Sequence, residues 1–187
     1  MASNTAAQHI DFLKGLIARP KNVGAIAPSS PALARAIARE VDPALAGSVL
    51  ELGPGTGVVT EALVERGVAE ERIAAVEFDP DFATLVQRRF PKARIVRGDA
   101  FDFARLFDEN ERFAAIVSGL PLLNHPAARR RALVENALAH LKPGAPFVQF
   151  SYGTRPPIPA PTGANVTRAA LILLNLPPAR VWVYRGA

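Results

Sequence analysis

An alternation of short apolar runs with helix-like stretches constrains the fold of this 187-residue chain more than any other feature. The apolar runs are Val49–Leu52, Ile73–Val76, Arg94–Val96, Ala114–Val117 and Pro146–Ser151. The stretches with helical character between them are Val58–Arg66, Pro80–Phe90, a short Phe103–Phe107 and Ala127–Leu141. A preceding helix is predicted from Ser30, an N-cap residue followed by proline, to about Val41. Strands that alternate with helices predict a parallel sheet covered on both faces.

The C-terminal stretch departs from this alternation. Thr154–Ala164 is rich in proline and glycine and is predicted to be a loop. Val166–Leu174 and Arg180–Tyr184 look like strands, with only Asn175–Ala179 between them. Because so short a link suits antiparallel neighbours, we expect a mostly parallel sheet with one reversed edge.

A glycine-rich turn follows the first predicted strand. Residues Glu51–Gly57 run from a strand into a helix, and their glycines allow a sharp turn and a close approach of the backbone to a ligand. The spacing of Gly53, Gly55 and Gly57 is G-x-G-x-G, which differs from the G-x-G-x-x-G of dinucleotide enzymes.

Two acidic residues end the next two predicted strands. Glu77 lies 20 residues after Gly57, where a carboxylate can accept hydrogen bonds from both hydroxyls of a ribose. Asp99 follows Gly98 and is placed to accept from an adenine amino group. The alternative for both is a helix cap or a solvated strand end, and Asp79 before Pro80 is better interpreted as such a cap. Together with the glycine turn, these acids indicate an adenosine-bearing ligand without a pyrophosphate.

These motifs resemble those of the class I S-adenosylmethionine-dependent methyltransferases. The resemblance implies a Rossmann-like α/β fold, in which a seven-stranded, mostly parallel sheet has an antiparallel last strand. It also implies S-adenosyl-L-methionine as cofactor and S-adenosyl-L-homocysteine as product. The residues it assigns to the cofactor are Glu51, Gly53, Gly55, Thr56, Gly57, Glu77, Phe78, Asp99 and Ala100. Acidic strand ends suit a sulfonium cation.

The segment Ser118–Asn124 follows the fourth predicted strand, where these enzymes present the acceptor to the methyl group. Ribosomal RNA adenine dimethyltransferases carry Asn-Leu-Pro-Tyr there, whereas this chain has Ser118 for the Asn and Leu122 for the Tyr. The bacterial phospholipid N-methyltransferases, which methylate phosphatidylethanolamine, match better and over nearly the whole chain. The segments that carry this match are Arg19–Pro20, Gly24–Ser29, Ser118–Pro121, Phe150–Gly153 and Asn175–Trp182.

The closer resemblance implies N-methylation of the phosphatidylethanolamine headgroup at a membrane surface, toward its mono- and dimethyl forms and phosphatidylcholine. Two alternatives stay open. One is an enzyme like the ribosomal RNA adenine N6-methyltransferases, and the other is a non-catalytic cofactor-binding protein that associates with membranes.

Tyr152 and Ser118 are the candidate catalytic residues. The Tyr152 ring can hold an ammonium by cation–π attraction, although packing at a strand end is the alternative. Residues expected to bind the substrate are Gly119, Leu120, Pro121 and Arg155, the last through the lipid phosphate. His125 could relay a proton, but a plain helix-start residue before Pro126 is the favoured interpretation.

The net charge of +5 is concentrated in the second half of the chain. Residues 101–187 hold ten Lys and Arg against five Asp and Glu, and no Asp or Glu follows Glu135. The cations Arg129–Arg131 open a helix, where they oppose the helix dipole and favour contact with an anion. Basicity alone favours a nucleic-acid partner. The Ser118 motif and the missing C-terminal RNA-binding domain are against RNA, so we expect a lipid substrate and an anionic membrane surface.

A single methyltransferase domain is expected over 1–187, with an N-terminal amphipathic helix and lid segment at 1–28 and the catalytic core at 29–187. Residues 5–18 have amphipathic helical spacing and are predicted to anchor the chain peripherally or to cover the cofactor. No apolar run reaches the roughly 18–20 residues of a membrane span, and no signal peptide is visible. The lack of cysteine excludes disulfides and zinc–thiolate sites, and no metal is expected. These features predict a cytoplasmic protein at the inner face of the membrane.

Overall fold

The computed structural model describes residues 30–175 and 177–186, so the predicted helix over 5–18 and the segment 1–28 lie outside the described residues. Seven strands form one sheet in the order β3-β2-β1-β4-β5-β7-β6. Their bounds are β1 Val49–Leu52, β2 Ile73–Glu77, β3 Arg94–Arg97, β4 Ala115–Ser118, β5 Phe147–Ser151, β6 Ala164–Ile172 and β7 Ala179–Gly186. The α/β architecture predicted from the alternation of strands and helices is confirmed.

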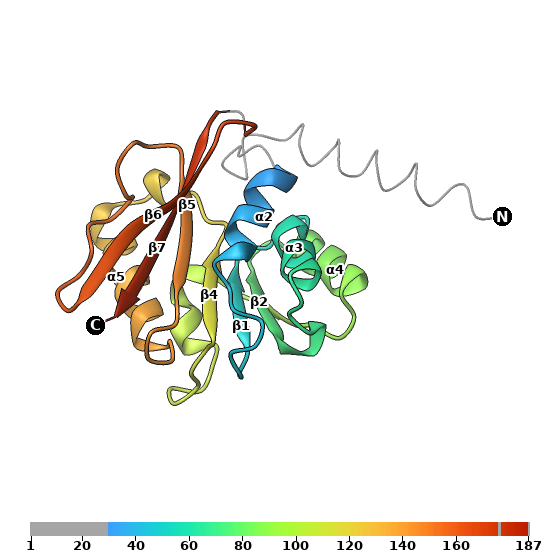
Figure 1. The fold of residues 1–187 in the computed structure, drawn as a ribbon. Helices are drawn as coiled ribbons and strands as arrows, with labels where there is room; N and C mark the ends of the chain where they lie inside the picture. The colour runs from blue at the N-terminus through green and yellow to red at the C-terminus, as the bar shows by residue number, and fades with distance from the viewer. Residues whose placement is uncertain (1–29, 176, 187) are drawn as a thin grey trace.

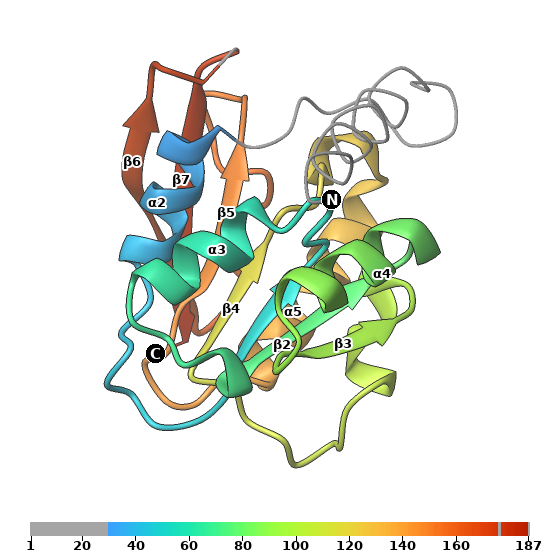
Figure 2. The same ribbon diagram turned by 90° about the vertical axis from the view of Figure 1, so that its right-hand side faces the viewer.

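Helices cover both faces of the sheet (Figures 1 and 2). The α-helices are α2 Pro31–Arg39, α3 Val58–Glu65, α4 Pro80–Arg89 and α5 Ala127–Ala139, and the short 3-10 helices are η1 Glu70–Arg72, η2 Ala100–Arg105 and η3 Leu122–Asn124. Side chains from α2, α3 and α4 pack on one face, and those from α5 and η2 pack on the other. Every residue of β1, β2, β4 and β5 is buried, as expected of central strands covered on both sides.

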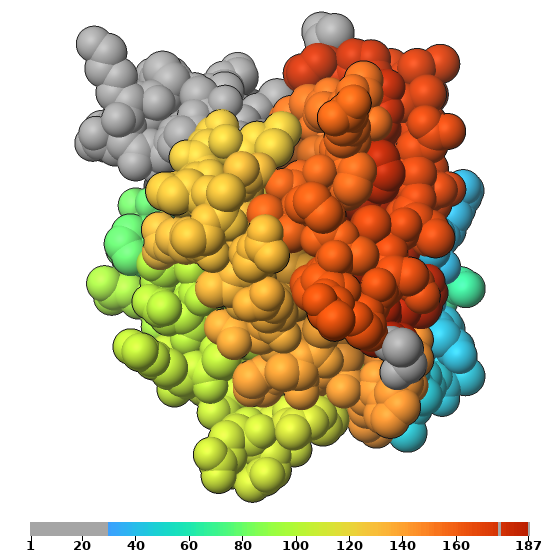
Figure 3. Space-filling view, turned by 90° about the vertical axis from the view of Figure 1, so that its left-hand side faces the viewer, coloured from blue at the N-terminus to red at the C-terminus, as the bar shows by residue number. Residues whose placement is uncertain are grey.

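The predicted seven-stranded, mostly parallel sheet with an antiparallel last strand is confirmed. The reversed strand lies inside the sheet, however, which corrects the expectation that it forms the edge. β7 pairs antiparallel with both β5 and β6, so β6 forms the edge and only β7 runs against the others. The short turn after Ile172 keeps β6 and β7 adjacent, while the long loop over 152–163 lets β6 skip one position. Figure 3 shows β6, β7 and this loop beside α5.

Two predicted helix caps are formed. The Ser30 hydroxyl accepts a hydrogen bond from the Leu33 amide at 3.2 Å and begins α2. The Asp79 carboxylate accepts from the amides of Asp81 and Phe82 and begins α4. Each cap satisfies amides that have no partner within the first turn of the helix.

The parallel strands end together at one edge of the sheet, which we call the carboxyl edge. Residues that end or follow β1, β2, β4 and β5 meet there, and in open α/β sheets ligands bind outside this edge. Among the residues that the structure describes, no helix is long and apolar enough to cross a bilayer.

Candidate functional site

The glycine turn after β1 depends on backbone angles that favour glycine. Gly53, Gly55 and Gly57 have φ of 73°, 55° and 82°, in the left-handed region. The Gly53 amide donates to the Val76 carbonyl at 2.9 Å, which fixes the turn to the end of β2. A Cβ built on Gly55 would meet nothing within 4 Å, so this side of the turn is open. The loop therefore presents bare backbone at the carboxyl edge.

Glu77 ties the end of β2 to the glycine turn. Its Oε2 accepts from the Gly55 amide and its Oε1 accepts from the Asp79 amide, both at 2.9 Å. The side chain is buried, yet each carboxylate oxygen keeps a second lone pair for a ligand hydroxyl. Next to it, the Phe78 ring is 75% exposed and free to pack against a flat ligand.

Glu51 is a buried acid beneath the same turn. The Thr60 hydroxyl of α3 donates to its Oε2 at 2.6 Å. Burial raises the pKa of Glu51 to about 7, the Thr60 hydrogen bond opposes this rise, and the charge of Glu77 adds to it. A cationic group bound near Glu51 would favour the ionised carboxylate and lower this pKa.

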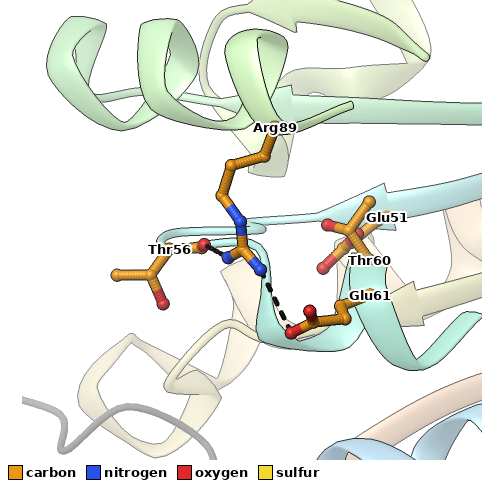
Figure 4. Close-up of polar contacts among 5 residues, drawn as sticks. All are labelled: Glu51, Thr56, Thr60, Glu61 and Arg89. Atoms are coloured by element: carbon orange, nitrogen blue, oxygen red, sulfur yellow. Dashed lines mark hydrogen bonds and ion pairs between the residues drawn. The ribbon is translucent and has the colours of Figure 1, made fainter. Parts of the chain in front are cut away.

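Arg89 of α4 also holds the glycine turn, through its backbone (Figure 4). This residue ends α4, donates to the Thr56 carbonyl and pairs with Glu61 of α3 at 3.1 Å. The sequence analysis missed both Arg89 and Thr60. No local motif marks Arg89, because it lies 33 residues after the carbonyl that it binds.

Asp99 forms the cap that the sequence left open as an alternative, and also an ion pair. Its Oδ1 accepts from the Phe101 amide at 2.9 Å and begins η2, while its Oδ2 meets the Arg129 guanidinium at 2.5 Å. Arg129 also lies 4.2 Å above the Phe101 ring, which contacts the His125 ring at 4.4 Å between centroids. An adenine amino group would share Asp99 with these partners.

The structure places the three arginines of the run in different surroundings, with Arg129 close to His125. Burial lowers the pKa of His125, and the Arg129 charge lowers it further, which keeps its ring neutral near pH 7. Arg130 donates to the Pro157 carbonyl at 2.7 Å, and Arg131 is exposed. Arg129 therefore belongs to the Asp99 side of the site, whereas Arg130 fastens the loop after β5.

The acceptor loop, residues 118–121, lies directly against the glycine turn. The Ser118 hydroxyl is buried and accepts from the Leu120 amide at 3.3 Å, so it shapes this loop as a positioning residue. A Cβ on Gly119 would lie 2.7 Å from the Gly53 carbonyl oxygen, and the Leu120 side chain covers Gly53. The two loops that the sequence predicts to bind cofactor and acceptor are thus in contact.

Gln149 is a further positioning residue that the sequence analysis missed. It is fully buried in β5, in register with Ser118 of β4, and its Nε2 donates to the Leu120 carbonyl at 3.0 Å. Its signal in the sequence is a large polar residue with apolar neighbours on both sides within the strand Phe147–Ser151. A polar side chain at such a position needs partners, and its Nε2 has two, the Leu120 carbonyl of the acceptor loop and the Phe150 carbonyl at 2.8 Å.

Tyr152 and Arg155 follow β5 at the carboxyl edge. The Tyr152 ring is half-buried and lies edge-on to Phe150 at 5.6 Å, so it packs against the core in the way the alternative interpretation predicted. Arg155 is exposed. Between them, the Gly153 carbonyl accepts from Arg180 of β7 at 3.2 Å, which links this loop to the last strand pair.

The arrangement fits an adenosine-bearing ligand with a cationic end. The open side of Gly55, the lone pairs left on Glu77 and the exposed Phe78 ring suit the nucleoside. The buried carboxylate of Glu51, poised near neutral pH, suits a positive group. In the part of the chain that the structure describes, no cluster of His, Asp and Glu could hold a metal ion.

Comparisons with known proteins agree with this geometry. Residues 49–144 match the methyltransferase domain family. The ornithine lipid N-methyltransferase of Singulisphaera acidiphila is 34% identical over 134 residues, covering 69% of this chain and 70% of that protein. An O-methyltransferase from Bacillus cereus, in complex with SAH, superposes with a TM-score of 0.65 over 95% of this chain and 90% of that chain, at 15% identity, which shows the fold alone.

A second group of relatives matches a smaller part of the chain. The ribosomal RNA small subunit methyltransferase A of Burkholderia is 38% identical over 89 residues, or 46% of this chain. The match spans only 32% of that relative's length. The lipid relative therefore shares far more of its length with this chain than the RNA relative does.

Proposed function

The chain belongs to the methyltransferase domain family, and on this premise we propose that it transfers methyl groups to the amine of a membrane aminolipid, with phosphatidylethanolamine as the acceptor. The observation that carries the aminolipid class is the 34% identity to an ornithine lipid N-methyltransferase over most of both chains, whereas phosphatidylethanolamine as the acceptor follows from the sequence resemblance. The same relative makes an ornithine lipid the second candidate acceptor, because ornithine also ends in a primary amine.

The acceptor loop supports a lipid amine over an RNA adenine. When the loop is aligned on Pro121, the Asn of the RNA motif falls on Gly119, one residue later than the Ser118 named from the sequence. Gly119 has no room for any side chain, since a Cβ would lie 2.7 Å from the Gly53 carbonyl oxygen. Leu122, at the position of the RNA enzymes' Tyr, is 2% exposed and cannot stack on a base.

The methyl donor is S-adenosylmethionine, which supplies a methyl group activated by a sulfonium sulfur. In the proposed complex, Glu77 accepts from the ribose hydroxyls while it keeps its bonds to the loop amides. The exposed Phe78 ring covers the adenine, and Asp99 with the Ala100 amide binds the adenine edge. Glu51 balances the positive end of the cofactor.

The amine must be neutral to react, and the acceptor side favours that form. A headgroup amine is protonated near pH 7, and both a nearby positive charge and exclusion of water lower its pKa. In the proposal, Leu120 and Leu123 exclude water, and exposed Arg155 binds the phosphate. Tyr152 holds the ammonium before it loses its proton, and the methylated ammonium after transfer, by cation–π attraction. Contact between the glycine turn and the acceptor loop would bring the methyl group and the amine close together, and such proximity can lower the barrier to methyl transfer by several kcal/mol.

A direct test offers the full chain labelled S-adenosylmethionine with three acceptors in parallel: phosphatidylethanolamine vesicles, ornithine lipid vesicles and RNA. We expect label in phosphatidylethanolamine, and a strongly reduced rate for Glu77→Ala. Label in ornithine lipid alone would change the acceptor but keep the aminolipid class. Label in RNA adenines without any lipid product would overturn the proposal, and cofactor binding with no transfer would favour the non-catalytic alternative.

A further inference from the structure

The exposed large apolar side chains gather at one edge of the molecule. Within residues 30–175 and 177–186, these side chains are Val64, Phe78, Leu123, Leu171, Leu173 and Leu174. Only Val64, in the last turn of α3, lies away from the carboxyl edge. Phe78 follows β2, Leu123 follows β4, and the other three belong to the end of β6 and the turn after it. The apolar surface is therefore on the side where the acceptor must enter.

The turn at the end of the β6–β7 hairpin exposes its apolar side chains and buries its polar one, which is the reverse of an ordinary surface turn. Leu173 and Leu174 are 71% and 88% exposed, and Leu171 just before them is 44% exposed. The sole polar side chain between Ala169 and Ala179 is Asn175, which is 4% exposed. We call Leu171, Leu173 and Leu174 the hairpin tip. Turns that face water carry polar side chains outward, so this turn is built to face something apolar.

Asn175 fixes the orientation of this turn. Its Nδ2 donates to the Pro177 carbonyl at 2.9 Å, and its Oδ1 accepts from the Ser30 amide at the start of α2 at 3.2 Å. These bonds hold the turn against α2 and leave Leu173 and Leu174 outward. Because these bonds already hold Asn175, less conformational entropy is lost at this position when the leucines insert.

Strand register places the hairpin tip at the same edge of the sheet as the acceptor loop, with β5 and β7 between them. Ser118 of β4 is level with Gln149 of β5, Ser151 of β5 is level with Arg180 of β7, and Arg180 is level with Leu171. The turn after Ile172 therefore projects past the ends of β4 and β5 on the carboxyl edge. Figure 2 shows the end of β6 and the start of β7 rising on the same side as the start of α5.

The charge around the hairpin tip suits an anionic surface. No Asp or Glu occurs after Glu135, so β5, β6, β7 and their loops contribute only cations and neutral groups. Arg155 is exposed in the loop after β5, and Arg180 is half-buried at the base of the hairpin. Exposed leucines in a region with no carboxylate and with exposed Arg155 at the same edge favour the interface of an anionic bilayer over an apolar groove on a protein.

We propose that the hairpin tip inserts into the interface of an anionic bilayer and brings the acceptor loop to the lipid headgroups. The inference rests on the proposed function in one respect, since it takes the acceptor to be a membrane lipid. It names a docking element separate from the predicted N-terminal helix.

Binding is tested with the full chain and vesicles of phosphatidylglycerol and phosphatidylcholine, which contain no primary-amine lipid. We expect the double variant Leu173→Ser, Leu174→Ser to bind about 10- to 100-fold more weakly in a flotation assay. Val64→Ser, which removes an exposed apolar side chain far from the carboxyl edge, is the matched control and should bind as the native chain does. Equal binding by the native chain and the double variant would overturn the proposal.

Insertion itself is tested with Leu174→Trp and vesicles whose acyl chains carry bromine. Bromine should quench the new indole, whereas the native Trp182, which is 7% exposed in β7, supplies the baseline. An unquenched indole at position 174 would contradict insertion. The tip could instead be covered by residues 1–29 or by a second copy of the chain. In that case the double variant would change the melting temperature or the oligomeric state and leave vesicle binding intact. This result too would overturn the proposal.

A substrate comparison separates this inference from the proposed function. The double variant should keep its rate on a water-soluble, short-chain phosphatidylethanolamine and lose it on the same headgroup in vesicles. If the native chain methylates neither form, the proposed function fails while the vesicle-binding result still decides the docking surface. If the variant loses both rates equally, the tip acts on the site itself and the docking proposal fails.

Discussion

The two halves of the carboxyl edge are built differently. On the cofactor half, Glu51, Glu77 and Asp99 all accept hydrogen bonds from the protein itself. On the acceptor half, beyond β4, the edge carries exposed leucines and arginines, and no Asp or Glu follows Glu135. The first half is preorganised by internal bonds, whereas the second offers surface to a partner. The difference matches one small ligand of fixed shape and one acceptor embedded in a larger assembly.

The halves meet at the contact between Gly53 and Gly119, and a substitution there should have the largest effect. In Gly119→Ala the new Cβ would lie 2.7 Å from the Gly53 carbonyl oxygen, so both backbones must move. A displacement near 1 Å between reacting groups can cost about 100-fold in rate, and we expect a loss of that order in methyl transfer. Gly186→Ala is the control, since its Cβ meets nothing within 4 Å. A rate within threefold of native, as a rough bound, would refute the importance of this contact.

The cofactor half is tested by Glu77→Ala. The substitution removes a charged acceptor for the ribose and also the bonds to the Gly55 and Asp79 amides. We expect S-adenosylmethionine to bind roughly 10- to 100-fold more weakly by calorimetry, because hydrogen bonds to charged groups contribute about 1.5–3 kcal/mol. The exposed Glu65→Ala on α3 is the matched control. Unchanged affinity in Glu77→Ala would refute the assignment.

Glu51 makes the stability of the folded chain depend on pH. Its pKa is raised to about 7 in the folded chain from an ordinary 4.5, so its contribution to stability is fully present below pH 4.5 and lost as pH rises through about 7. Glu51→Gln keeps an acceptor for Thr60 but cannot ionise. The ligand-free variant should therefore gain about 2–3 kcal/mol over the native chain between pH 5 and pH 8 in urea unfolding. A stability difference that does not vary with pH would contradict the raised pKa.

The acceptor half is tested by Tyr152→Phe, for which we expect the smallest effect. Phenylalanine keeps the ring packing on Phe150 and removes only the hydroxyl. In the proposed complex the hydroxyl also accepts a hydrogen bond from the headgroup amine, so we expect turnover to fall by roughly 2- to 10-fold with cofactor affinity unchanged. Parallel measurements of kcat and of cofactor binding would decide. Equal losses in both would mean that Tyr152 is purely structural.

Much of the cofactor half was predictable because its signals are local. The glycine turn, the caps at Ser30 and Asp79 and the strand ends at Glu77 and Asp99 each depend on a few consecutive residues. The partners that hold these elements were not predictable in the same way. Arg89 and Gln149 lie 33 and 29 residues from the carbonyls that they bind, and no local pattern encodes such a pairing.

The sequence by itself determined the alternation of strands and helices, the glycine turn and its acids, and the concentration of cations after Glu135. These follow from backbone preference and side-chain chemistry, which act at short range. Only the tertiary structure decided that β7 enters the sheet beside β5 and that Gly119 contacts Gly53. It also decided that the leucines after β6 face outward at the carboxyl edge. Those outcomes depend on which segments pack together, because burial and register are properties of the assembled sheet rather than of any one segment.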